Sequence, residues 1–278
     1  MLTSIHHTTI ITPVTAAFSN SLIPTPPLPA QFLRFRTSPR ENFRYLKTLG
    51  IIEPNTKFYK SPSPETLDKI LSTVEFFTSR GFSTSDFRRV AFLCPELFSP
   101  DFDPSCVQPV FDFLATELPA SPEQCKGLIV RCPGLLLSDV DLCLRQTWLY
   151  LKSLGVEKLN APTTLNAHLL NTRVPKLAEK VRYLRSVGLS YEEAGTVCAR
   201  FPAIFGYSVE HNLRPKVEFL KVMGMSAVEV LNGFPQYLGF SLQKRIAPRY
   251  LHLQKRKVKV PLKRMLMWGD EKFYGKWK

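Results

Sequence analysis

The chain has 278 residues, a formal net charge of +14 and 44% hydrophobic residues, which is enough apolar material to build a sizeable core. No stretch approaches the about 18 uncharged apolar residues that a membrane-spanning helix needs, so we expect no membrane span. The six cysteines include no Cys-x-x-Cys pair, and small buried thiols are the simpler interpretation than a metal or disulfide framework. Composition therefore argues against membrane-spanning and disulfide-stapled proteins.

The first 40 residues differ in composition from everything after them. They contain no Asp or Glu, many Ser and Thr, a proline-rich run at 24–29, and three basic residues that begin only at Arg34. Such a leader is typical of an organellar transit peptide, and early hydroxyl residues with few, late arginines favour a chloroplast over a mitochondrion. We therefore predict a disordered, cleaved chloroplast transit peptide over residues 1–40; the alternative is a merely disordered N-terminus. Residues 41–66 are expected to hold half a repeat and a Pro- and Ser-rich linker.

One pattern recurs five times between residues 67 and 240: three apolar residues at i, i+4 and i+7, then a glycine-type break, a capping residue and an x-Pro stop. Successive triples start 37, 37, 33 and 36 residues apart. This spacing places each triple on one helix face, and repetition at this period predicts stacked helical units. The triples are Ile70/Val74/Phe77, Val107/Phe111/Leu114, Leu144/Trp148/Leu151, Leu177/Val181/Leu184 and Leu213/Val217/Leu220, followed by Ile246/Tyr250/Leu253 in a C-terminal cap.

Each repeat is predicted to contain two helices with marked ends. Four of the five triples are followed, four residues later, by a glycine that can close the helix in a left-handed conformation; Leu118 replaces it in the remaining repeat. The second helices are expected to begin at capping-box serines, and each should stop before a proline that opens a short 3-10 turn. The serines are Ser83, Ser121, Ser190 and Ser226, and the prolines are Pro95, Pro133, Pro202 and Pro235. The third repeat is degraded, with Asn166 where the pattern expects proline. We thus predict an all-α solenoid of about five repeats from about residue 65 to 255.

Positive charge is concentrated at the C-terminal end. Residues 241–278 carry twelve Lys and Arg against two acidic residues, whereas residues 41–240 are almost balanced. A positive electrostatic potential that rises towards the C-terminal end suits a polyanion bound along the repeats. The alternative is that residues 241–278 are simply a solvated basic tail. The aromatic residues interleaved with these cations are Tyr250, Trp268, Phe273, Tyr274 and Trp277. They could stack on bases, although core packing is the alternative for Tyr250. We predict nucleic-acid contacts from Lys244, Arg245, Arg249, Lys255, Arg256, Lys257, Arg214, Lys216, Lys221, Arg182 and Arg185, with Arg173, Lys176 and Lys180 on the same path.

Enzymatic motifs are missing from the sequence. It contains no P-loop, no G-x-G-x-x-G, no G-x-S-x-G and no H-E-x-x-H. Adjacent Glu192 and Glu193 resemble a carboxylate pair, but the capping box that starts at Ser190 accounts for Glu193. We therefore expect neither catalysis nor a metal or other cofactor.

Two segments of the chain resemble a known family. The run from Pro202 to Leu220, PAIFGYSVEHNLRPKVEFL, resembles the repeat of the mitochondrial transcription termination factor (mTERF) family. The run SLQKRIAPRY from Ser241, followed by Met265 and by GDEKF from Gly269, resembles that family's closing segment. The resemblance spans roughly residues 65–278, with repeat, stop and closing segment in register. It implies a left-handed α-superhelix of helix–helix–3-10 units whose basic concave groove binds nucleic acid.

The resemblance also implies a function. Plant members of the family act mostly in plastids and mitochondria, in transcription, RNA processing or intron splicing. We therefore expect a monomeric plastid factor that binds RNA or double-stranded DNA, with RNA favoured, and other plastid transcription or RNA-processing proteins as candidate partners. The alternative is a helical-repeat scaffold that binds proteins in its groove. Charge along the groove separates the two, because a scaffold does not need the basic C-terminal segment.

Overall fold

The computed structural model describes residues 38–278, and every regular element within them is a helix. The transit peptide predicted for residues 1–40 therefore lies almost entirely outside the described residues, and its last residues already belong to the first helix. The α-helices are α1 (Pro39–Thr48), α2 (Pro64–Thr78), α3 (Thr84–Leu93), α4 (Gln108–Thr116), α5 (Pro122–Arg131), α6 (Arg145–Ser153), α7 (Thr164–Leu170), α8 (Val174–Ser186), α9 (Tyr191–Arg200), α10 (Arg214–Val222), α11 (Ala227–Gly233), α12 (Ala247–Lys255), α13 (Leu262–Met267) and α14 (Asp270–Lys276).

Short helical turns connect these helices. Turns of 3-10 helix are η2 (Phe58–Lys60), η3 (Pro95–Phe98), η4 (Pro104–Val107), η5 (Pro133–Leu137), η7 (Pro202–Gly206) and η9 (Pro235–Gly239). Single π-helical turns are η6 (Val140–Leu144), η8 (Val209–Leu213) and η10 (Leu242–Ile246), and each leads directly into the first helix of a repeat. The sequence pattern did not anticipate these π turns.

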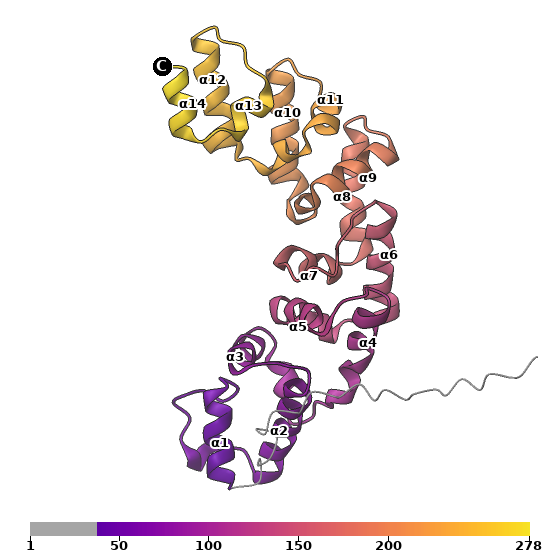
Figure 1. The fold of residues 1–278 in the computed structure, drawn as a ribbon, viewed down its shortest axis with the longest axis vertical. Coiled ribbons are helices and arrows are strands. Elements are labelled where there is room, and N and C mark those ends of the chain that lie inside the picture. Colours follow the sequence, from indigo (N-terminus) through magenta and orange to yellow (C-terminus); the bar gives the residue numbers. More distant parts are fainter. Residues whose placement is uncertain (1–37) are drawn as a thin grey trace, which may run out of the picture. The chain divides into compact units, whose positions relative to one another are not determined.

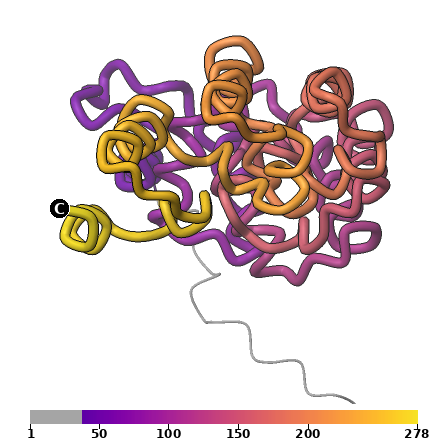
Figure 2. The backbone as a smooth tube through the Cα atoms, turned by 90° about the horizontal axis from the view of Figure 1, so that it is seen from above, coloured from indigo at the N-terminus to yellow at the C-terminus, as the bar shows by residue number. Residues whose placement is uncertain are grey.

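The helices form an all-α solenoid of stacked repeats. Five pairs follow one another in chain order, from α2 and α3 to α10 and α11. Second helices stack on second helices, as in the contacts of α3 with α5, α5 with α7 and α9 with α11, and α6 stacks on α8 among the first helices. Within residues 38–278 the repeats follow a curve rather than a straight line (Figures 1 and 2). The repeat prediction from the triples is confirmed.

The predicted apolar triples form the core. All of their side chains are buried except Trp148 and Tyr250, which are half-buried. Both rings pack against an aromatic ring of the preceding repeat instead: Trp148 lies 6.2 Å from Phe113 and Tyr250 lies 5.7 Å from Phe219, both edge to face. Such contacts add about 0.5–1.5 kcal/mol to the area they bury. Aromatic contacts between successive first helices therefore supplement the aliphatic core.

The helix ends follow the predicted signals. α3, α5, α9 and α11 each end two residues before their proline, which then opens a 3-10 turn. Complete capping boxes start at Ser83, Ser121 and Ser190, whereas Ser226 accepts the Glu229 amide without a reciprocal bond from the glutamate. Leu118 does not adopt the positive φ of the glycines that close the other first helices.

The third repeat corrects one prediction. Asn166 does not mark a helix end, because it lies in the first turn of α7, where its backbone amide bonds to the Thr163 hydroxyl. Its side-chain amide also donates to the carbonyls of Lys158 and Ala161 and so stabilises the entry loop. α7 ends at Leu170 with Asn171 as its C-cap, and the chain passes into α8 without a 3-10 turn. The repeat is degraded through loss of this turn, five residues later than the sequence suggested.

The helical part also exceeds the predicted range. α1 buries Phe43 and Leu46, as expected for half a repeat, and α13 and α14 continue past residue 255. Among the described residues, no helix is both long and apolar enough to cross a membrane.

Candidate nucleic-acid interface

One position of the repeat lies beside the apolar triple and buries a polar side chain in five of its six copies. We call the residue three places after the first residue of a triple the latch position; it is occupied by Thr73, Val110, Thr147, Lys180, Lys216 and Arg249. All six are buried, and they include five of the six buried polar or charged side chains found in residues 38–278. A buried polar group needs a partner, so this position shows which basic residues are used inside the fold.

Lys180 pairs with the neighbouring Glu179 at 3.1 Å, and the Thr73 hydroxyl has no hydrogen-bond partner within residues 38–278. The other polar latch residues bond to carbonyl groups that follow the second helix of the same repeat or, for Arg249, lie in the cap. The Thr147 hydroxyl donates to the Thr172 carbonyl at 2.8 Å. Lys216 Nζ donates to the Leu238 carbonyl at 2.5 Å and to Asn212 Oδ1 at 2.6 Å. Burial lowers the pKa of the Lys216 ammonium. These bonds tie the first helix of a repeat to its closing turn.

Arg249 performs the same task in the C-terminal cap with more bonds. Its guanidinium donates to the carbonyls of Met265 at 2.6 Å and Trp268 at 2.7 Å, and to Asp270 Oδ1 at 2.5 Å. It also lies 4.5 Å from the ring centre of Phe273. The hydrogen bond from Arg249 holds the pKa of the Asp270 carboxyl below its ordinary value. Arg249 therefore fastens α13 and α14 to α12.

Burial corrects part of the predicted contact set. Lys180, Lys216 and Arg249 are 4%, 5% and 1% exposed, so the fold makes them unavailable to a phosphate group. Helix periodicity placed them beside the core stripe, but it could not show that carbonyls from later turns meet Lys216 and Arg249 there.

The other predicted residues stay at or near the surface. Arg245 is half-buried, at 5.7 Å from the ring centre of Phe240. Arg214 is exposed but pairs with Glu210 and lies 5.5 Å from the Tyr183 ring centre, and its bond to Glu210 raises its pKa. The exposed positions without an ion pair in residues 38–278 are Lys244, Lys255, Arg256, Lys257, Lys221, Arg182, Arg185, Arg173 and Lys176.

The strongest positive charge lies in the last elements. Ten of the twelve Lys and Arg residues in 241–278 are exposed, and the Arg249–Asp270 pair is the one salt bridge found within this segment. We call the exposed ten the C-terminal basic surface: Lys244, Lys255, Arg256, Lys257, Lys259, Lys263, Arg264, Lys272, Lys276 and Lys278. It can attract a polyanion at a distance and neutralise phosphates on contact.

The aromatic side chains of this segment are largely occupied by one another. Trp268 and Trp277 stack at 5.1 Å with an angle of 13° between their planes, and Phe273 is fully buried beside them. Tyr274 is 36% exposed and contacts His252 edge to face at 4.9 Å. Packing therefore limits which of these rings could stack on a base: Phe273 is inaccessible, and the two tryptophans pack against each other as part of the cap.

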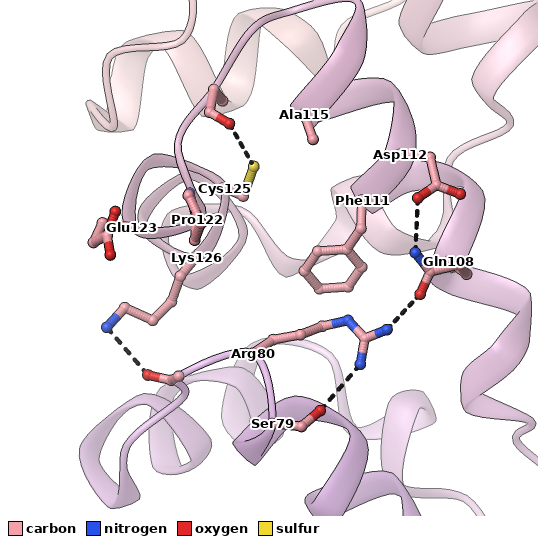
Figure 3. Close-up of a pocket in the computed structure, with 12 residues that line it drawn as sticks. Ser79, Arg80, Gln108, Phe111, Asp112, Ala115, Pro122, Glu123, Cys125 and Lys126 are labelled. Carbon is pink, nitrogen blue, oxygen red and sulfur yellow. Dashed lines mark hydrogen bonds between the residues drawn. The ribbon is translucent and has the colours of Figure 1, made fainter. Parts of the chain in front are cut away.

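A cavity between the first two repeats serves as a contrast. It has a volume of about 500 Å³ between the end of α2, α4 and α5. Arg80 lies across the Phe111 ring and bonds to Gln108, while Lys126 donates to the Gly81 carbonyl (Figure 3). Asp112 and Glu123 also line the cavity, so its charges balance. This cavity is not suited to an anion.

Besides the basic surfaces, the described residues contain thiols and other side chains of the types that can ligate metals. Within residues 38–278 no three His, Cys, Asp or Glu side chains are grouped so that they could hold a metal ion. Burial raises the pKa of the Cys94 and Cys198 thiols to about 12, so neither is a reactive thiolate near neutral pH.

Comparisons with known proteins agree with the repeat architecture. The family model named mTERF matches residues 117–274, which is more than half of the chain. The chain is 35% identical over 98 residues to the transcription termination factor MTERF2, chloroplastic, and 33% identical over 86 residues to MTERF5, chloroplastic, both of Arabidopsis thaliana. These matches cover 35% and 31% of the chain and 15% and 17% of the relatives.

A longer match reaches a further relative. The transcription termination factor MTERF15, mitochondrial, of Arabidopsis thaliana is 24% identical over 252 residues, which is 84% of the chain and 54% of the relative. The chain thus spans about half or less of the length of these curated relatives. Because the family model covers most of the solenoid and the closing segment, the chain belongs to the mTERF family.

Proposed function

We propose that this protein is an organellar factor that acts in plastid gene expression by binding nucleic acid rather than by catalysis. The steps open to it are transcription termination or regulation, transcript processing and group II intron splicing. The observation that carries the proposal is the C-terminal basic surface on a rigid helical cap. Ten exposed cations and a single internal salt bridge leave this segment with positive charge that the described part of the chain does not compensate.

The cap makes this charge more useful than a flexible tail would. Arg249 and the Trp268–Trp277 stack hold α13 and α14 in place, so the backbone that carries these lysines need not be ordered when a ligand binds. Because ordering side chains and segments costs binding free energy, a preformed basic surface binds more tightly than a disordered one of equal charge. Arg182, Arg185 and Lys221 on α8 and α10 offer further cations in the repeats that precede the cap.

Location in a plastid is supported by two independent lines. Residues 1–40 have the composition of a plastid leader, and MTERF2, MTERF5 and MTERF8 of Arabidopsis thaliana are named as chloroplastic. MTERF15 is named as mitochondrial, which makes the mitochondrion the alternative. α1 begins at Pro39 with Ser38 as its cap, so removal of residues 1–37 would leave the first helix complete.

The ligand we favour is single-stranded or structured RNA, with duplex DNA as the second choice. Sequence-specific RNA binding uses unpaired bases and stacking, and the partly exposed Trp268, Tyr274 and Trp277 border the C-terminal basic surface. No regular series of base-reading side chains repeats along the solenoid. Phosphate contacts are therefore expected to provide most of the affinity.

The test compares two charge-matched double variants of the full chain. Lys244→Ala with Lys255→Ala removes two cations from the C-terminal basic surface, and Lys69→Ala with Lys152→Ala removes two exposed cations from earlier repeats. Two lost contacts to a single strand should make the slope of log affinity against log salt shallower by about 1.4. The control should bind as the unchanged protein does. Equal binding by both variants would reject the C-terminal surface as the nucleic-acid site.

A second candidate function, a protein-binding scaffold, has one specific observation in its favour. A groove of about 430 Å³ between the α10 end and the cap is lined mainly by apolar side chains such as Met223, Met225, Leu253 and Met265. Methionine-rich surfaces adapt readily to apolar partner segments. The scaffold reading predicts that Met225→Asp abolishes function in the organelle while RNA binding in vitro is unchanged.

A further inference from the structure

The first helix carries a basic stripe with the same spacing as the apolar triples. Arg40, Arg44 and Lys47 stand at i, i+4 and i+7 on α1, so they share one face. Phe43 and Leu46 of the same helix are buried. The stripe is therefore held in place by a helix that is anchored through its apolar residues. These residues precede the part of the chain that matches the mTERF family model.

The loop before η2 closes over this stripe and forms a pocket. The pocket has a volume of about 470 Å³, and Arg40, Arg44 and Lys47 line it together with Asn55, Lys57 and Phe58. Lys47 Nζ donates to the Thr56 carbonyl at 2.9 Å, which fixes the loop against α1. Two elements thus bring four cations around one hollow.

The charge of this pocket is not neutralised by its surroundings. No carboxylate lines it, and none of the four cations forms a salt bridge within residues 38–278. Their contacts are neutral: Arg40 lies 5.3 Å from the ring centre of Phe58, and Lys57 lies 5.9 Å from that of Tyr59. Nearby Glu41 instead accepts a hydrogen bond from the Ser38 hydroxyl at 3.3 Å. The cavity of Figure 3 is similar in size but balances its charges, whereas four cations line the pocket on α1.

We propose that this pocket is a second nucleic-acid site, which binds phosphodiester groups of a single strand. Four cations around a hollow of this size can surround a phosphate group, with the Asn55 side chain as a further hydrogen-bond donor. Tyr59 is 75% exposed beside the pocket and offers a ring on which an adjacent base can stack. The site rests on the proposed function and extends it to the first helix of the chain, far in sequence from the C-terminal basic surface.

The experiment uses the full chain and a fluorescently labelled single-stranded RNA of mixed sequence. Arg44→Gln with Lys57→Gln removes two exposed pocket cations that have no hydrogen bond or salt bridge within the described residues. Lys69→Gln with Lys152→Gln is the charge-matched control. The pocket variant should make the log affinity against log salt slope shallower by about 1.4, while the control leaves it unchanged. Thermal unfolding should coincide for all three proteins, because every substituted side chain is exposed.

A further arm tests the stacking position and separates the two proposals. Ultraviolet crosslinking of the bound RNA should yield an adduct on Tyr59 that disappears in the pocket variant. Equal slopes of log affinity against log salt for the pocket variant and the control, with no adduct on residues 55–60, would overturn the proposal that the pocket binds RNA. If the unchanged chain still binds RNA in that case, the proposed function is upheld. Failure of the unchanged chain to bind RNA or DNA would overturn both.

Discussion

Replacement of Arg249 by Ala tests whether the residue is a structural latch or a phosphate contact. The Arg249 side chain is 1% exposed, and its guanidinium satisfies the Met265 and Trp268 carbonyls. Hydrogen bonds from a charged donor contribute about 1.5–3 kcal/mol each, and their removal leaves two carbonyls without a partner. The bond to Asp270 is not counted because that carboxylate side chain is 70% exposed and solvent screens it.

The expected loss is therefore about 3–5 kcal/mol, since neighbouring contributions do not add fully. Repeat proteins are stabilised mainly by contacts between adjacent units, so the loss should fall on α13 and α14 rather than on the whole solenoid. Opening of these helices should become at least about 100-fold more frequent, because every 1.4 kcal/mol is a factor of ten.

Hydrogen exchange followed by mass spectrometry measures this directly. Peptides from residues 262–276 should lose protection in Arg249→Ala, whereas peptides from α4 to α9 should exchange as in the unchanged protein. Lys244→Ala, at an exposed position one turn earlier, is the control and should leave protection unchanged. The latch assignment is refuted if Arg249→Ala keeps the wild-type protection of α13 and α14 and yet loses affinity for nucleic acid, because the residue would then act on the ligand itself.

The remaining predictions concern the core, a helix end, pH and import. Val217→Ala removes two buried methyl groups from a side chain that is 5% exposed and should lower the free energy of unfolding by about 1–3 kcal/mol in denaturant titration; an unchanged midpoint would show that the triple does not face the core. Gly155→Ala forces a Cβ onto a residue with φ +82° and should cost about 1–2 kcal/mol, whereas Gly206→Ala, with no positive φ and open space at its Cβ, should unfold at nearly the wild-type temperature. The hydrogen bond from the Ser190 amide lowers the pKa of Glu193 below its ordinary value of 4.5, so the native state binds fewer protons than the unfolded state. The stabilisation by this cap is therefore complete above pH 4.5 and is lost as the pH falls through the lowered pKa. In thermal melts from pH 6 to 3, Glu193→Gln should weaken this pH dependence, and identical pH curves for the two proteins would contradict the prediction. Residues 1–37 fused to a fluorescent reporter should direct it into plastids in leaf cells, and a purely mitochondrial or cytosolic signal would reject the plastid leader.

Sequence reasoning recovered the elements whose signals are local. The spacing of Leu213, Val217 and Leu220 fixes a helix face, and Pro202 must end a helix because it lacks an amide proton and clashes with the preceding turn. Ser190 with Glu193 satisfies two amides at a helix start. These signals act over a few residues, so a single sequence suffices to read them, and the structure confirms each of them.

The parts that escaped prediction depend on contacts between distant residues. The burial of Arg249 depends on carbonyls 16 and 19 residues later in the chain, and nothing near Arg249 in the sequence indicates them. The pocket on α1 forms because Lys47 bonds to the Thr56 carbonyl across a loop that composition describes only as a linker. In the third repeat α7 ends with Asn171 as its C-cap and no 3-10 turn follows, which period counting cannot detect.

The proposed function rests on contact between nucleic acid and the exposed cations of the C-terminal cap. Ultraviolet crosslinking of RNA to the full chain, followed by mass spectrometry of the modified peptides, tests it most directly. If these cations form the site, adducts should fall within residues 241–278, outside the buried latch residue Arg249, and should be lost at high salt. Adducts confined to residues 64–170, or binding that does not weaken as salt rises, would contradict it.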